Sequence, residues 1–342
     1  MNTTFLKRAL GLAVAGSLII GALAGCGGSS DSAEAAGSAA DSSAAAEEIV
    51  VRIGAQPFPL YTPVYVAYER GYIEEELAAV GATYTWDEFQ SGPLVNEAVA
   101  AGEEDVGFMA DLPAIIAKST GQEIEIVSNV AYGEEALAVL VTPDSEIKSV
   151  SDLKGKTVGY ATGSYAQHLL ALLLENEGLS LDDVESVNLG AGDQPAALAN
   201  GEVDAIVIWE QYISKLTSEG TAKVLADGTG IKKGNMITYF VTEYAEAHPE
   251  VVEAYIKALD RANADLESDP KGCAADIAED FGVSTELMEQ IITKFTFKTA
   301  LDQDDIDEIT AVKDFSLDAG IIQNDVDMGS FINTEYLDAV NK

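Results

Sequence analysis

Two stretches far apart in the chain share one pattern of helix, turn and strand residues. Residues 96–111 read NEAVAAGEEDVGFMAD, and residues 195–210 read PAALANGEVDAIVIWE. Aligned without a gap, Gly102 falls on Gly201, Asp105 on Asp204, and Asp111 on Glu210. In each stretch a helical pattern closes at a glycine, and an apolar run follows an aspartate. The repetition predicts two lobes of similar α/β build.

Strand and helix signals alternate around both stretches. In the first series we expect strands at 49–53, 83–86, 105–109 and 123–130, and helices at 63–70, 94–101 and 112–118. In the second we expect strands at 157–160, 184–189, 205–208 and 236–241, and helices at 165–177, 196–200 and from 249 almost to the end. This βαβα order predicts parallel sheets covered by helices.

The two series also suggest where the chain divides. We expect one lobe to comprise residues 49–138 together with 240–342, and the other to comprise residues 139–239. The apolar runs 136–141 and 236–241 are then the segments that cross between the lobes. An α/β fold of two lobes has a natural place for a ligand in the cleft between them.

Residues 1–25 have the pattern of a signal peptide. Lys7 and Arg8 precede an apolar run rich in small residues, and the run ends at Leu23-Ala24-Gly25-Cys26. These four residues resemble a bacterial lipobox, which implies that Cys26 is lipidated and holds the mature chain on the outer face of a membrane. Residues 27–48 are Gly, Ser, Ala, Asp and Glu almost throughout, a composition typical of a flexible tether.

Charge and composition exclude several classes of function. The formal net charge of −39 rules out a nucleic-acid partner, because phosphate backbones are bound by stripes of Lys and Arg. Apart from Cys26 there is only Cys273, so an intramolecular disulfide within the mature fold is not expected. With two histidines besides, the chain cannot make a structural zinc cluster, and we expect no metal and no cofactor.

Several predicted helices begin with a polar residue, a proline, or both, directly after a predicted strand. The loops in question are 56–61, 90–93, 111–113, 162–165, 193–195 and 209–210. Proline is favoured in the first helical turn, where the N–H has no helical partner. In open α/β sheets the ligand lies beyond the carboxyl ends of the strands. A cleft surrounded by helix N-termini would therefore attract an anion without Lys or Arg.

Catalytic motifs give no support for an enzyme. Ser164 lies outside any Gly-x-Ser-x-Gly pattern, and the sequence contains neither a Walker loop nor a Rossmann fingerprint. His168 follows Ser164 by one helical turn, so its ring either reaches the cleft or packs against a neighbouring helix. Trp209 stands at the end of a predicted strand and leaves the same two alternatives open.

Longer segments resemble the solute-binding proteins of ABC importers. The resemblance covers nearly the whole chain from Ile49 and is carried by VRIGAQPFPLYTPVYVAYERGYIEEEL, WDEFQSGPLVNEAVAAGEEDVGFMADLPAIIAK, SVSDLKGKTVGYATGSYAQHLLALLLENEGLSLDDV, VDAIVIWEQY, KVLADGTGI and YAEAHPEVVEAYIKALDRA. The aliphatic sulfonate group, within the wider nitrate, taurine and thiamine-precursor binding family, is the most similar. The resemblance implies a type II periplasmic-binding-protein fold, in which two α/β lobes joined by two crossing strands close on one ligand.

The resemblance also implies which residues bind the ligand. They are Gln56, Phe58, Tyr61, Ser91, Gly92, Asp111, Leu112, Gly163, Ser164, Tyr165, Trp209 and Glu210. The backbone N–H groups of Gly92, Leu112 and Ser164 and the side chains of Gln56, Ser91 and Ser164 are expected to hold sulfonate oxygens, while aromatic side chains contact the organic tail. Two positions depart from the family pattern. Tyr165 stands where a small residue is common, and Ala110 where glycine is common.

The function implied is capture of a small organosulfonate and its delivery to an ABC permease and its ATPase. The protein is then an extracytoplasmic monomer, with a Gram-positive surface favoured over a periplasm. Alternatives are a nitrate or bicarbonate receptor, a receptor for a pyrimidine precursor of thiamine, a signalling receptor, and an exported enzyme.

Overall fold

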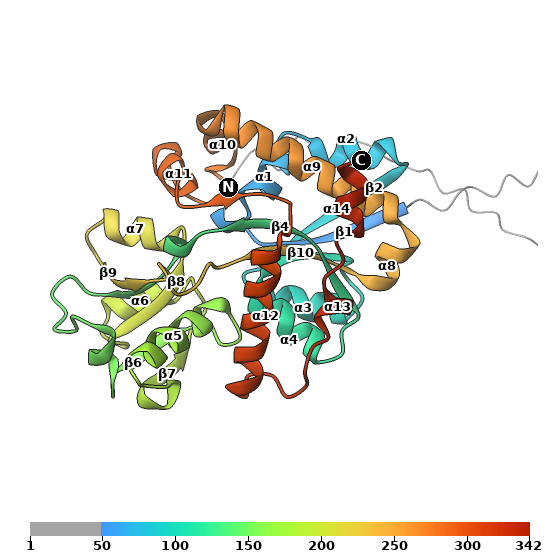
Figure 1. Cartoon of the computed structure of the whole chain (residues 1–342). Coiled ribbons are helices and arrows are strands. Elements are labelled where there is room, and N and C mark those ends of the chain that lie inside the picture. The colour runs from blue at the N-terminus through green and yellow to red at the C-terminus, as the bar shows by residue number, and fades with distance from the viewer. Residues whose placement is uncertain (1–48) are drawn as a thin grey trace, which may run out of the picture. The chain divides into compact units, whose positions relative to one another are not determined.

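The computed structural model describes residues 49–342, which contain two mixed β-sheets (Figure 1). The first sheet has the order β11-β4-β10-β3-β1-β2 and the second β7-β6-β8-β5-β9. The predicted signal peptide, the lipidation of Cys26 and the tether lie outside the described residues. Within the described part, no helix is both long and apolar enough to cross a membrane.

The strands of the first sheet are β1 (Ile49–Ala55), β2 (Ala82–Glu88), β3 (Val106–Ala110), β4 (Ile124–Tyr132), β10 (Met236–Val241) and β11 (Thr296–Phe297). Those of the second are β5 (Leu137–Val141), β6 (Thr157–Tyr160), β7 (Glu185–Asn188), β8 (Ala205–Trp209) and β9 (Lys223–Asp227). The predicted strands are all present. The structure adds β5, a run the sequence placed in a crossing segment, as well as β9 and β11.

The helices that accompany the first sheet are α1 (Thr62–Glu69), α2 (Tyr72–Ala79), α3 (Gly92–Ala100), α4 (Asp111–Ser119), α8 (Thr242–Ala247), α9 (Pro249–Ser268), α10 (Pro270–Ile277), α11 (Thr285–Ile292), α12 (Gln303–Asp318), α13 (Met328–Phe331) and α14 (Glu335–Val340). The second sheet is covered by α5 (Tyr165–Asn176), α6 (Gln194–Ala199) and α7 (Tyr212–Ser218). Short 3-10 turns are formed by Pro59–Tyr61, Glu134–Ala136, Val150–Leu153 and Leu181–Asp183.

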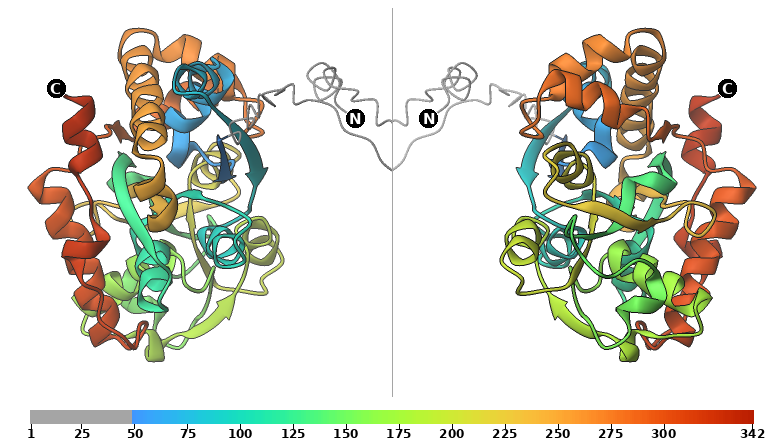
Figure 2. Two further views of the ribbon diagram at one scale, coloured as in Figure 1. Left: turned by 90° about the vertical axis from the view of Figure 1, so that its right-hand side faces the viewer. Right: turned by 90° about the vertical axis from the view of Figure 1, so that its left-hand side faces the viewer.

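Helices cover both faces of the first sheet. Helix α9 packs with α1 and α2 on one face, and α3 and α4 lie on the other (Figure 1). Helix α12 packs against α4, and the C-terminal segment, red in the figures, runs along one side of the molecule (Figure 2). Because the helices cover the faces of the sheet, the carboxyl ends of β1 and β3 remain accessible to a ligand.

The prediction of parallel sheets is correct except where the chain returns from the other lobe. Strand β1 pairs in parallel with β2 and β3, as β6 does with β7 and β8. Strand β10 is antiparallel to both β3 and β4, and β5 is antiparallel to both β8 and β9. Each of these two strands enters its sheet directly from the other sheet, and this connection reverses its direction.

The same pairing locates the passages between the sheets. The sequence placed them in runs 136–141 and 236–241, but β5 lies wholly in the second sheet and β10 wholly in the first. The chain therefore crosses just before these strands, at residues 133–136 and 228–235. We propose that the lobes divide at these passages, close to the boundaries expected at residues 138 and 240.

The repeat found in the sequence has a structural counterpart. Asp105 precedes β3, accepts a hydrogen bond from the backbone N–H of Arg52 at 3.0 Å, and donates its own N–H to the Arg52 carbonyl at 2.9 Å. Asp204 precedes β8 and makes the same pair of bonds with Thr157, at 2.9 and 2.8 Å. In the first lobe an aspartate thus joins the start of β3 to β1, and in the second lobe an aspartate joins the start of β8 to β6.

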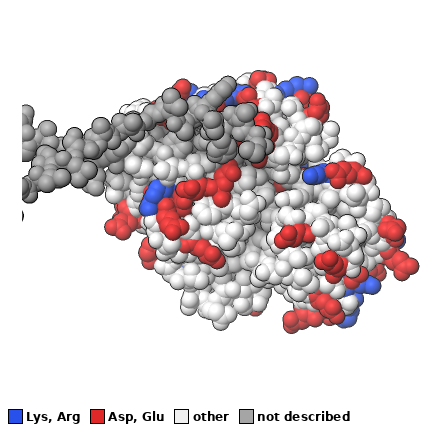
Figure 3. Space-filling model, turned by 180° about the vertical axis from the view of Figure 1, so that it is seen from behind, with Lys and Arg blue, Asp and Glu red and all other residues white. Residues whose placement is uncertain are grey.

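Acidic side chains are spread over the surface. The face in Figure 3 carries many Asp and Glu and few Lys and Arg among its described residues. The ion pair between Lys271 and Glu289 at 3.3 Å is typical of this surface, with the lysine side chain 78% exposed. On this face, the described residues form no basic stripe of the kind that binds nucleic acid.

Candidate functional site

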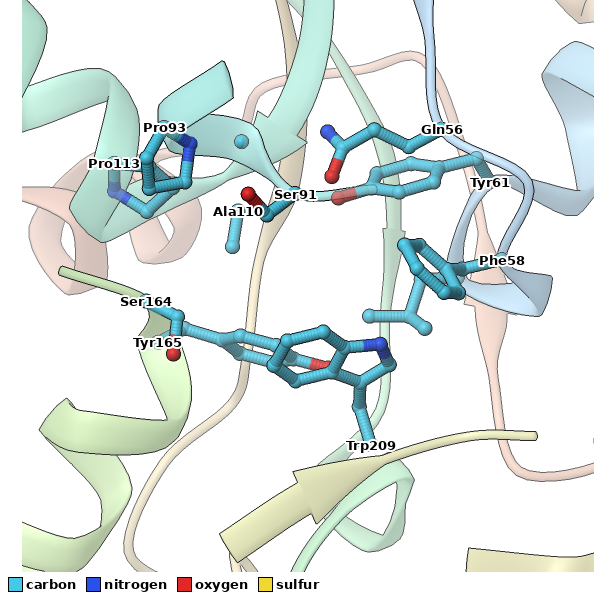
Figure 4. Close-up of a pocket in the computed structure, with 12 residues that line it drawn as sticks. Gln56, Phe58, Tyr61, Ser91, Pro93, Ala110, Pro113, Ser164, Tyr165 and Trp209 are labelled. Carbon is cyan, nitrogen blue, oxygen red and sulfur yellow. The ribbon is translucent and has the colours of Figure 1, made fainter. Parts of the chain in front are cut away.

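A small cavity lies where the segments at the carboxyl ends of β1, β2, β3, β6 and β8 meet (Figure 4). Its free volume is about 20 Å³, and it is lined by Gln56, Phe58, Leu60, Tyr61, Ser91, Gly92, Pro93, Ala110, Pro113, Ser164, Tyr165 and Trp209. The lining comes from both lobes, because residues 56–113 accompany the first sheet and residues 164–209 the second. Room for about one water molecule means that any organic ligand enters by displacement of side chains or of a lobe.

The structure brings most of the predicted site residues to this cavity. Those that line it are Gln56, Phe58, Tyr61, Ser91, Gly92, Ser164, Tyr165 and Trp209. Leu60, Pro93, Ala110 and Pro113 also line it and were not among the predicted site residues. The sequence contained a signal for the two prolines, since each stands in a first helical turn that was expected to face the cleft.

Gly163, Asp111, Leu112 and Glu210 do not line the cavity. The backbone N–H of Leu112 is occupied, because it donates to Oδ1 of Asp111 at 2.7 Å. The N–H of Gly163 donates to the side chain of Gln167 at 2.8 Å. These groups therefore support the first turns of α4 and α5 from behind the cavity wall.

Two helix N-termini present unoccupied donors at the cavity, one from each lobe. Among the described residues, the backbone N–H groups of Gly92 in α3 and Tyr165 in α5 have no hydrogen-bond partner. Pro93 follows Gly92 and has no N–H of its own. The first turn of a helix carries a partial positive charge, so N–H groups at such positions can bind an anion.

Side-chain caps are less common at the cleft than the sequence predicted. Ser164 is a cap, since its Oγ accepts from Ala166 N at 3.2 Å while donating to the Ala161 carbonyl at 2.6 Å. Ser91 precedes α3 without a side-chain cap, which leaves its hydroxyl available to a ligand. The Gln56 amide donates to the Phe108 carbonyl at 2.7 Å, and this bond fixes the side chain beside the cavity.

Aromatic rings close one end of the cavity. Phe58 and Trp209 come from different lobes and meet edge to face with their centroids 5.8 Å apart, and Tyr165 lies 5.7 Å from Trp209. Ser91, Pro93, Pro113 and Ser164 lie toward the other end (Figure 4). The cavity therefore has a polar end at the helix N-termini and an aromatic end.

Behind α4, a buried ion pair joins Asp111 to Lys232. The Lys232 ammonium lies 2.9 Å from Asp111 Oδ2 and 3.2 Å from Oδ1, and both side chains are completely inaccessible to solvent. The sequence predicted a positive cleft built without basic side chains. Within residues 49–342 no Lys or Arg lines the cavity, but Lys232 reaches the base of α4 behind it from the passage between the sheets.

Glu210 occupies the equivalent place in the second lobe. Its carboxylate accepts from Ser214 N at 3.1 Å and from the Ser214 hydroxyl at 2.9 Å, at the start of α7. Lys294 also bonds to this carboxylate, whose side chain is fully buried. Both acids bond to N–H groups at helix N-termini, and each in addition pairs with a lysine distant in the sequence.

His168 packs between the lobes and does not line the cavity. It is 3% exposed, its ring lies 4.6 Å from that of Phe315 in α12, and neither ring nitrogen has a hydrogen-bond partner. Burial, with a smaller contribution from the charge of Lys232, lowers its pKa from 6.5 to about 2. Of the two alternatives that the sequence left open, the structure shows helix packing.

We expect His168 to make the protein less stable in mild acid. Because the folded pKa is lowered, the stabilisation is complete above pH 6.5 and is lost as the pH falls toward about 2. Below pH 6.5, this effect lowers the free energy of unfolding by about 1.4 kcal/mol per pH unit. Urea unfolding at pH 7.5, 6.5 and 5.5 measures this loss as the difference in the free energy of unfolding between wild type and His168→Leu.

The comparison with His168→Leu is needed because Glu104 and Asp280 titrate in the same pH range. Burial raises both pKa values to about 7, so their contributions to stability increase as the pH falls. A constant difference between wild type and His168→Leu across the three pH values would contradict the prediction.

A family model described as NMT1/THI5 like matches residues 59–273, which is most of the described chain. The chain belongs to the NMT1/THI5-like family. A Bacillus subtilis member, named a putative aliphatic sulfonates-binding protein, is 31% identical over 311 residues, covering 88% of this chain and 90% of its own length. An Escherichia coli protein of the same name is also 31% identical, and there the match spans 60% of this chain and 64% of the relative.

Solved structures agree with this family and confirm the predicted fold. The alkanesulfonate-binding protein SsuA from Xanthomonas axonopodis pv. citri, solved with bound MOPS, superposes with a TM-score of 0.77 at 28% identity. The superposition covers 85% of this NMT1/THI5-like chain and all of the SsuA chain. The architecture of two α/β lobes is therefore that of periplasmic binding proteins.

Proposed function

We propose that this protein is the solute-binding component of an ABC importer and captures a small organosulfonate outside the cytoplasm. The observation that carries the proposal is the pair of unoccupied N–H groups, Gly92 from one lobe and Tyr165 from the other, at one cavity. Relatives named for aliphatic sulfonates support the choice of anion.

The geometry suggests a division of roles in the cavity. The N–H groups of Gly92 and Tyr165 and the hydroxyl of Ser91 bind sulfonate oxygens, while Phe58 and Trp209 contact the organic group. Asp111 and Glu210 stay behind the wall, where a carboxylate does not repel the anion directly. A ligand bonded to both lobes stabilises their closed arrangement, and a permease can recognise that state.

The location and partners belong to the same proposal. Lipidation at Cys26 would hold the protein on the outer face of the membrane beside the permease and its ATPase, with residues 27–48 as tether. We propose a monomer on a Gram-positive surface, with a periplasm as the alternative. Mass spectrometry of the membrane-extracted protein tests the lipid on Cys26.

Binding of alkanesulfonates is expected to raise the unfolding temperature. A ligand that binds only the folded state adds about 2.7 kcal/mol at a concentration of 100 times its Kd. Titration calorimetry and thermal unfolding with ethanesulfonate, taurine, nitrate, bicarbonate and a hydroxymethylpyrimidine measure the preference. Binding of nitrate, bicarbonate or the pyrimidine without any sulfonate would refute the sulfonate assignment and favour the corresponding alternative.

The same samples distinguish a receptor from an enzyme. Among residues 49–342, no group of three or more His, Cys, Asp and Glu is placed to hold a metal ion. Recovery of the sulfonate unchanged after long incubation is expected for a binding protein, whereas release of sulfite would indicate an exported enzyme.

A further inference from the structure

The aromatic end of the cavity carries two polar groups without partners. Neither the hydroxyl of Tyr165 nor Nε1 of Trp209 has a hydrogen-bond partner among the described residues. Both side chains line the cavity, and they are 5% and 4% exposed. A buried polar group without a partner is unfavourable, and most such groups in proteins are satisfied.

The neighbouring side chains cannot satisfy these two groups. Phe58, Leu60 and Ala110 are apolar, and an aromatic ring accepts at most a weak N–H···π contact. The Ser164 Oγ already accepts from the Ala166 N–H and donates to the Ala161 carbonyl. In Figure 4, Tyr165 and Trp209 lie on the side of the cavity opposite Gln56, Tyr61 and Ser91. A group of the ligand itself is therefore the available partner.

From this geometry we infer that the ligand carries, beyond its sulfonate, a neutral hydrogen-bond acceptor that Tyr165 and Trp209 bind. This inference rests on the proposed function and narrows it to short sulfonates with a hydroxyl or carbonyl group. An indole N–H can only donate, so the group that meets Trp209 must accept. An ammonium group such as that of taurine has no lone pair to offer.

Burial at this end of the cavity favours a neutral acceptor over a carboxylate. Burial raises the pKa of Tyr165 well above 10, so the hydroxyl stays protonated and able to donate. No Lys or Arg of the described chain lines the cavity, so a second full negative charge beside Tyr165 would be desolvated without a counter-charge.

The size of the cavity favours a short ligand. The Tyr165 ring lines the cavity, whose free volume is only about 20 Å³. Typical small-molecule sites are many times larger, so a longer alkyl tail needs a larger displacement of side chains or of a lobe than a short one does. Tyr165 is thus a specificity-determining residue. Its ring shortens the site, and its hydroxyl places a hydrogen-bond donor at the aromatic end.

Titration calorimetry with matched two-carbon sulfonates tests the inference. Ethanesulfonate, 2-hydroxyethanesulfonate, taurine and sulfoacetate share one head group and differ only at the far end. We expect 2-hydroxyethanesulfonate to bind the wild-type protein about tenfold or more tightly than ethanesulfonate, because only the former satisfies the buried donors. Taurine and sulfoacetate are expected to bind more weakly than 2-hydroxyethanesulfonate.

The variant Tyr165→Phe removes the hydroxyl and keeps the ring. Its preference for 2-hydroxyethanesulfonate over ethanesulfonate is expected to fall to about threefold or less. Tyr160→Phe is the matched control, since its hydroxyl bonds to Ser186 at 2.8 Å away from the cavity lining. That control should keep the wild-type ratio.

The outcomes separate this inference from the function on which it rests. Equal wild-type affinities for ethanesulfonate and 2-hydroxyethanesulfonate, or a ratio unchanged in Tyr165→Phe, would overturn the second polar subsite and leave a sulfonate receptor. Failure of every sulfonate to bind the folded wild-type protein would overturn the proposed function itself.

Discussion

Asp111→Asn is expected to lower the free energy of unfolding by about 3–5 kcal/mol, because it leaves the Lys232 ammonium buried without a counter-charge. Both side chains of the pair are inaccessible to solvent, and the two nitrogen–oxygen distances are 2.9 and 3.2 Å. Asparagine is similar in size to aspartate and still offers an oxygen to the Leu112 N–H. The measured loss therefore reports the charge and not a cavity.

Equilibrium unfolding in urea measures this effect, with two controls. The double variant Asp111→Asn with Lys232→Met removes both charges, and we expect it to regain most of the lost stability. Glu289→Gln breaks the exposed pair with Lys271, and we expect a change below about 1 kcal/mol. A single variant within about 1 kcal/mol of wild type would mean that Lys232 is solvated or finds another partner.

The sequence predicted the arrangement of the site better than its electrostatics. The strand at 157–160 and the helix that starts at 165 match the structure, because dense apolar runs end there at Gly163 and Gly178. The repeat correctly paired Asp111 with Glu210. The lysine partners were missed, since Lys232 is 121 residues from Asp111 and no local pattern links them.

Some elements were missed for local reasons. Helix α2 reads YIEEELAA, and only Ile73 and Leu77 in it are buried, too few apolar positions for a clear periodic pattern. The antiparallel direction of β5 and β10 depends on how the chain passes between sheets, and neither strand's own residues specify it. Helix starts were predicted within about two residues, and of the expected caps near the cavity Ser164 and Asp111 bond through their side chains to a helix N–H.

The bond between Lys294 and Glu210 joins the two lobes beside the cavity. Lys294 follows α11, which packs with the helices of the first sheet, and Glu210 follows β8 of the second. One residue further along, the Gln211 side chain donates to the Phe281 carbonyl at 2.5 Å. If the ligand is held by closure of the lobes, these contacts stabilise the closed state and break when the lobes separate.

Lys294→Met is therefore expected to weaken ligand binding by about 30-fold or more, mainly through faster dissociation, since loss of one partner from a buried interfacial charge pair costs about 2–5 kcal/mol. Calorimetry and stopped-flow kinetics with the sulfonate that binds wild type measure the effect.

Lys271→Met removes a lysine of the same kind from a pair between α10 and α11, within one lobe, and should leave the affinity unchanged. Adding Glu210→Gln to Lys294→Met should recover part of the affinity, because no buried charge then remains unpaired. An unchanged dissociation rate in Lys294→Met, in a protein that still unfolds cooperatively, would show that this pair acts on folding alone and not on closure.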